Sequence, residues 1–284
     1  GFLRPAASMA AGPDTNAEND FVRIADLIKR NAFAQAEVTH NGAPAPREGA
    51  AVIGMATALA LETLLKQTAA AGSTSRSADD FVPWFFDRLD ASIEGFVGHN
   101  GVKKRTFAKQ LSRARSFCIE VRDLGVAVMA SDEENRDAYQ QAQAQLAALL
   151  KKHKLKSNLT AVDAVSTAVA AAVAFIECTL RSSSSGCVEG GLRGLLVFAI
   201  SLPGDPDTVA AMAAAVFCTC FGYERCVGSG QEGGGGGGGR SGATGPFRLA
   251  NLCRSIQSFD VVIALAPALA KINNIRYGDH HNMK

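Results

Sequence analysis

Residues 202–208 read LPGDPDT, and the apolar run VAAMAAAVFCTCF follows at 209–221. Proline fixes its own φ near the helical value and disfavours a helical conformation in the residue before it. The stretch therefore predicts a helix with Pro206 as its first residue and Asp205 as its N-cap, and it places Asp207 and Thr208 in the first turn. Because the following run is almost entirely apolar, the pattern predicts a buried helix whose start carries two carboxylates and a hydroxyl.

The oxygen atoms of Asp205, Asp207 and Thr208 are suited to binding a hard cation. Mg²⁺ prefers carboxylate and other oxygen ligands and usually keeps several waters, so a partial set of protein ligands is chemically sensible. The alternative interpretation is structural, because acidic residues and Thr at a helix start also cap the helix and complement its dipole. The residues alone leave both interpretations open.

Nearly every other periodic segment of the 284-residue chain is also typical of a helix. In 17–31, for example, Phe21, Ile24 and Leu27 fall on one helical face. No run alternates with a period of two for long enough to indicate a sheet, so the sequence predicts an all-α fold. The further predicted helices are 48–71, one from 81 to 93, 103–123, 132–153, 160–181, 187–200, 208–223, 246–258 and 260–272.

Composition and charge are those of a globular protein without a nucleic-acid partner. The chain is 47% hydrophobic and 20% charged, and its net charge is +2. Its length is enough to bury a core in one or two domains. The dense basic cluster at 151–156 ends a predicted helix, where cations complement the dipole, so it does not by itself indicate nucleic-acid binding.

Three further observations bear on compartment and organisation. The seven Cys residues show no zinc-ligand spacing, which indicates buried reduced thiols and favours the cytoplasm, with the nucleus or an organelle as alternatives. The apolar stretches 165–176 and 209–221 are short for a membrane span, so no membrane contact is expected. Seven consecutive Gly within 226–245 lack the context of a phosphate-binding loop and predict a disordered insertion.

Several segments, in the same order, resemble the ADP-ribosylglycohydrolase family. Residues 199–223 are similar to its C-terminal metal motif, a loop of the type S-x-G-G-D-[TS]-D-T that leads into a small-residue helix. Val38-Thr39-His40 and the helix 49–65 resemble its T-H turn and the helix that follows, and 162–168 is similar to a further motif. Phe2-Leu3-Arg4-Pro5 resembles the end of its Gly-rich loop. The resemblance covers residues 1 to about 272, followed by a polar tail at 273–284, and it implies a multi-helix orthogonal bundle.

This resemblance implies Mg²⁺-dependent hydrolysis of the bond that joins ADP-ribose to a modified protein or to another ADP-ribose unit. It implies that Asp205, Asp207 and Thr208 bind the metal, as one half of a two-ion site, and that His40 contacts the ADP-ribose. The partners would be an ADP-ribosylated protein or an ADP-ribose polymer. The catalytic residues remain unknown, because the family's first acidic metal motif and its catalytic carboxylate have no counterpart in these 284 residues.

Two departures from the family pattern define an alternative. Pro203 and Pro206 replace Gly and Thr or Ser of the motif, which leaves the loop less freedom to adapt to a metal. The chain also begins part-way through the Gly-rich loop, so the resemblance implies a C-terminal portion, expected to be inactive alone. The alternative is a non-catalytic helical binding or scaffold module that keeps the fold without the chemistry.

Overall fold

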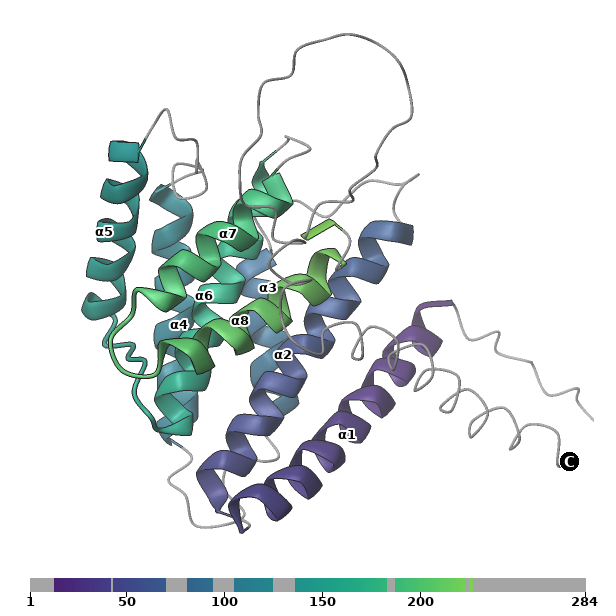
Figure 1. Ribbon diagram of the computed structural model, residues 1–284. Coiled ribbons are helices and arrows are strands. Elements are labelled where there is room, and N and C mark those ends of the chain that lie inside the picture. The colour runs from purple at the N-terminus through teal and green to yellow at the C-terminus, as the bar shows by residue number, and fades with distance from the viewer. Residues whose placement is uncertain are drawn as a thin grey trace, which may run out of the picture. The chain divides into compact units, whose positions relative to one another are not determined.

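The computed structural model describes residues 13–41, 43–69, 81–93, 105–124, 136–182, 187–222 and 225–226 (Figure 1). Every regular element within these ranges is a helix, which confirms the predicted all-α fold. The chain divides into two compact units, Gly1–Tyr223 and Glu224–Lys284, and the helices below belong to the first. They are α1 (Pro13–His40), α2 (Pro44–Ala69), α3 (Phe81–Ile93), α4 (Arg105–Leu124), α5 (Arg136–Lys152), α6 (Ala161–Arg181), α7 (Cys187–Ile200) and α8 (Pro206–Phe221).

Helix α1 is the element that differs most from the sequence prediction. It was expected at 17–31, with His40 in a turn before the next helix, but it continues to His40 itself. Tertiary packing extends it, because Ala36 is buried and the ring of Phe33 lies 4.9 Å from the guanidinium carbon of Arg47 on α2. The predicted helices 246–258 and 260–272, the glycine-rich segment 226–245 and residues 2–5 lie outside the described residues.

Helix α6 forms the centre of the first unit. Residues 164–179 are all buried, and α6 contacts α2, α3, α4, α7 and α8 (Figure 1). Alanines at 168, 170, 171, 172 and 174 leave room for neighbouring backbones to approach, while Phe175 packs 6.1 Å from the ring of Phe198 on α7. Truncating a buried Phe to Ala typically costs about 3–5 kcal/mol. Phe175 therefore contributes to the packing of α6 against α7.

By length and composition, α6 and the first 22 residues of α2 could cross a membrane. The apolar stretch 165–176 was expected to be too short, but the helix that contains it has 21 residues. Within the protein, 83% of the apolar window of α6 is buried, compared with 56% for α2. That burial identifies α6 as the central core helix of the described fold.

Helices α2, α6 and α8 begin at the same end of the first unit (Figure 1). A Cβ on Gly49, near the start of α2, would lie 3.2 Å from the Cβ of Ala161, the first residue of α6. The segment before α6 in turn contacts the start of α8, since the N–H of Asp205 donates to the carbonyl oxygen of Ser157 over 2.7 Å. The fold thus brings three helix starts together, and α8 carries the predicted metal ligands.

Candidate metal site at the start of helix α8

The loop before α8 is held firmly against the segment before α6. Leu202 is buried and anchors the loop, and the side-chain hydroxyl of Ser157 donates to the carbonyl oxygen of Pro203. Gly204 has a φ of +105°, and a Cβ there would overlap the carbonyl oxygen of Ser157 and lie 3.0 Å from its carbonyl carbon. Only glycine fits this position. The close approach lets the next N–H, that of Asp205, bond to Ser157.

The segment that supports the loop is itself fixed to α6. Leu155 is buried, and the hydroxyl of Thr167 donates to the carbonyl oxygen of Lys156 over 2.7 Å. Ser157, the next residue, is 2% exposed although it is polar. Burial of a polar residue is favourable only when its groups are hydrogen-bonded, and both the hydroxyl and the carbonyl of Ser157 bond to the loop.

Asp163, which lies in a stretch that resembles a family motif, connects three parts of the fold through hydrogen bonds. One carboxylate oxygen accepts from Gln110 over 3.2 Å and the other from Asn158 over 3.1 Å. Its N–H donates to the hydroxyl of Thr160, the N-cap of α6, over 3.3 Å. These bonds tie α4, the supporting segment and α6 together.

Asp205 and Asp207 come together as the sequence predicts. Asp205 is the N-cap of α8 and Pro206 its first residue. The Asp205 side chain makes no capping bond to the helix, and its carboxyl group interacts with that of Asp207. The interaction with Asp205 is the main reason that the pKa of Asp207 lies below its ordinary value, and the N–H groups of Thr208 and of Asp207 itself lower it further.

The start of α8 is accessible and rich in oxygen. Asp205 is half-buried, while the side chains of Asp207 and Thr208 are exposed. No group of three or more His, Cys, Asp or Glu residues that could hold a metal occurs in the part of the chain that the structure describes. A cation here would have two carboxylates and one hydroxyl as protein ligands. That donor set fits one Mg²⁺ that keeps several waters.

His40 lies at the end of α1, and its side chain is exposed. Its carbonyl oxygen accepts from the N–H of Ala43 over 3.0 Å, and Asn41, with a φ of +49°, reverses the chain into α2. The turn therefore lies near the start of α2, at the end of the unit where α8 also begins. Among the described contacts, none joins His40 to the loop that carries the three predicted metal ligands.

Sequence reasoning missed two residues at this end of the unit. Ser157 holds the loop, yet it stands in the ordinary polar stretch KSNLT with no signal of that role. Glu48, on α2, is only 5% exposed, and burial raises the pKa of its carboxyl group. One of its carboxylate oxygens is buried and has no hydrogen-bond partner among the described residues. An acid near a helix start is common, so no sequence pattern distinguishes Glu48 from other acids.

Comparison with known proteins identifies the family. No curated protein and no solved structure matches the chain. The family described as ADP-ribosylglycohydrolase matches residues 7–226, which include α1 to α8 and the loop that carries Asp205. Because the match covers most of the chain, this protein belongs to the ADP-ribosylglycohydrolase family.

Proposed function

We propose that the protein is a Mg²⁺-dependent hydrolase that removes ADP-ribose from modified protein or from an ADP-ribose polymer. Family membership supports the reaction class. The observation that carries the metal assignment is the position of two carboxyl groups, those of Asp205 and Asp207, at the N-cap and in the first turn of α8, where Asp207 is exposed. Two acids this close can bind one cation together, and the adjacent hydroxyl of Thr208 supplies a third oxygen.

The reaction class sets what the site must do. Cleavage at the anomeric carbon of ribose passes through an oxocarbenium-like state, so the leaving atom needs an acid or electrophile and a water must be activated. A bound Mg²⁺ would supply Lewis acidity that orients ribose hydroxyls and lowers the pKa of a bound water. Asp205 and Asp207 would provide the negative charge that holds the cation, and the exposure of Asp207 leaves room for substrate beside it.

The residues around the two acids hold the candidate metal loop in place. Pro206 fixes the backbone between the two acids, and the bond from Asp205 N–H to Ser157 fixes the loop on the fold. A site held in this way loses little conformational entropy when a ligand binds. The two proline replacements in the motif are therefore compatible with a preorganised metal site.

The test measures Mg²⁺ binding by calorimetry and ADP-ribose release from modified protein and from polymer, using the protein at its natural length. The variant is Asp205→Asn with Asp207→Asn, and the control is Asp137→Asn, an exposed acid in the first turn of α5. We expect the double variant to lose measurable Mg²⁺ binding and at least about 100-fold in activity, which corresponds to about 2.7 kcal/mol. Equal Mg²⁺-dependent activity in the double variant and the wild type would refute the assignment.

A second candidate function is a non-catalytic module that binds ADP-ribose. The observation that favours it is the small ligand set, since among the described residues only two carboxylates lie at the start of α8. This candidate predicts ADP-ribose binding that does not change when Mg²⁺ is removed, and no release of ADP-ribose. The same calorimetry with and without a chelator distinguishes the two.

A further inference from the structure

The basic cluster 151–156 ends α5 and leads into the segment that supports the candidate metal loop. At the end of α5, the N–H of Lys154 donates to the carbonyl of Lys151 over 3.0 Å, and the N–H of Leu155 donates to that of Leu150 over 3.1 Å. This pair of bonds, with Leu155 buried, is the Schellman ending of a helix. The cluster therefore has a fixed backbone.

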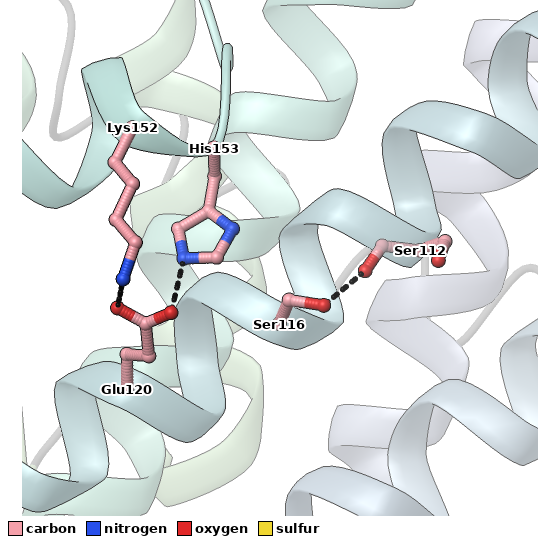
Figure 2. A network of polar contacts seen from close by, with 5 residues as sticks. All are labelled: Ser112, Ser116, Glu120, Lys152 and His153. Atoms are coloured by element: carbon pink, nitrogen blue, oxygen red, sulfur yellow. Dashed lines mark hydrogen bonds and ion pairs between the residues drawn. The ribbon is translucent and has the colours of Figure 1, made fainter.

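Two members of the cluster are already paired. Lys152 Nζ lies 2.7 Å from one carboxylate oxygen of Glu120 on α4, and His153 Nε2 lies 3.0 Å from the other. Figure 2 shows both side chains converging on Glu120. The ring of His153 also stands edge-on to Phe117, with the ring centres 6.3 Å apart. These contacts attach the end of α5 to α4.

The other three lysines of the cluster do not pair with Glu120. Lys151, Lys154 and Lys156 are exposed, and within the described residues no carboxylate lies within ion-pairing distance of any of them. Lys151 lies in the last turn of α5, where a cation complements the helix dipole. The helix dipole does not explain a cation at Lys156, because this residue lies beyond the end of α5.

Lys154 occupies a position that favours another residue. Its φ is +55°, and the residue that follows a helix in this left-handed conformation is usually Gly or, less often, Asn. A lysine there strains the backbone. The chain thus carries a positive charge at a place where an uncharged residue would suit the fold better.

The cluster leads directly into the support of the candidate site. The carbonyl of Lys156 is held by Thr167, and the next residue, Ser157, bonds to both Pro203 and Asp205. Adjacent Cα atoms are about 3.8 Å apart. Lys156 is therefore one residue away from the side chain that holds the loop, and Lys154 is three residues away.

We propose that Lys151, Lys154 and Lys156 form a phosphate-binding surface for a substrate that extends beyond one ADP-ribose unit. Each further unit of an ADP-ribose chain carries a pyrophosphate, and exposed lysines bind such groups as point charges. This inference rests on the proposed function, because it assumes that the unit to be cleaved lies at the start of α8. It deepens that function by making the polymer a better ligand than a single ADP-ribose unit.

The test compares two variants with the same loss of charge. One is Lys154→Gln with Lys156→Gln, and the control is Arg30→Gln with Arg193→Gln, two exposed cations on α1 and α7. The measurement is binding of a fluorescent ADP-ribose polymer and of monomeric ADP-ribose over a range of salt concentrations. We expect Lys154→Gln with Lys156→Gln to weaken polymer binding about tenfold and to reduce the slope of log K against log salt by about 1.4.

Monomer binding should be unchanged in both variants, and the control should bind polymer like the wild type. A third variant, Lys154→Gly, separates loss of charge from loss of folding. It relieves the backbone strain, so it should unfold at a higher temperature than the wild type and still bind polymer more weakly.

Either of two results would overturn the inference. The first is equal loss of polymer binding in the Arg30 and Arg193 control, which would show a general effect of net charge. The second is competition by single-stranded RNA as effective as that by the ADP-ribose polymer, which would show a non-selective polyanion surface. Polymer binding does not require turnover, so its loss in the lysine variants is distinguishable from loss of Mg²⁺-dependent release in the variant of Asp205 and Asp207.

Discussion

Replacing Gly204 with Ala tests how the candidate metal loop is held. A Cβ at Gly204 would overlap the carbonyl oxygen of Ser157, so the loop must lift away and lose the 2.7 Å hydrogen bond from Asp205. The left-handed backbone of Gly204 costs an Ala about 1–2 kcal/mol, and the lost hydrogen bond costs about 1 kcal/mol. The lower entropy of the unfolded Ala variant offsets about 0.4–1 kcal/mol of that loss.

The net destabilisation is about 2 kcal/mol before any steric strain is added. In a unit of this size, about 2 kcal/mol corresponds to a fall in Tm of roughly 4–8 °C. Calorimetry or urea unfolding would measure it, together with Mg²⁺ binding, which should weaken because Asp205 moves with the loop.

Gly222 provides a matched control for this variant. It also has a positive φ, +82°, but a Cβ there would meet nothing within 4 Å. Gly222→Ala should therefore show only the conformational cost, about 1 kcal/mol less than Gly204→Ala, and normal Mg²⁺ binding. Equal destabilisation by the two substitutions, with Mg²⁺ binding intact in both, would refute the reasoning that contact with Ser157 holds the loop.

Two further predictions concern pH and are tested by urea unfolding at a series of pH values. Because burial raises the pKa of Glu48, the wild type loses stability as pH rises through that pKa; Glu48→Gln should be the more stable at neutral pH and equal to wild type below about pH 4.3. The exposed Glu37→Gln is its control, and the same gain there would contradict the role of burial. Lys152, and then His153, lower the pKa of Glu120, so Glu120→Gln should be less stable than wild type at neutral pH, and the difference should vanish as pH falls through the lowered pKa. A difference for Glu120→Gln that persists unchanged in acid would contradict the ion pair as its cause.

The start of α8 was predictable from sequence because its causes are local. Pro206 restricts its own φ and the conformation of Asp205 through covalent geometry, and both residues lie where that rule puts them. The partner of the loop was not predictable, because Ser157 lies 46 residues before Pro203 and only the packed fold brings them together. The position of His40 was not predictable for the same reason. Local signals place it in a turn, but contacts between α1 and α2 accompany the extension of α1 as far as His40.

The meeting of the starts of α2, α6 and α8 gives this end of the protein an electrostatic character that comes from its backbone. A helix start carries the equivalent of about half a positive charge, so three of them place roughly +1.5 at one end of the unit. The carboxylates of Asp163, Asp205 and Asp207 carry three full negative charges at the same end, which outweigh the backbone contribution and favour a cation there. Because peptide dipoles do not depend on side chains, replacing these acids with amides should change this end of the unit from one that attracts cations to one that attracts anions.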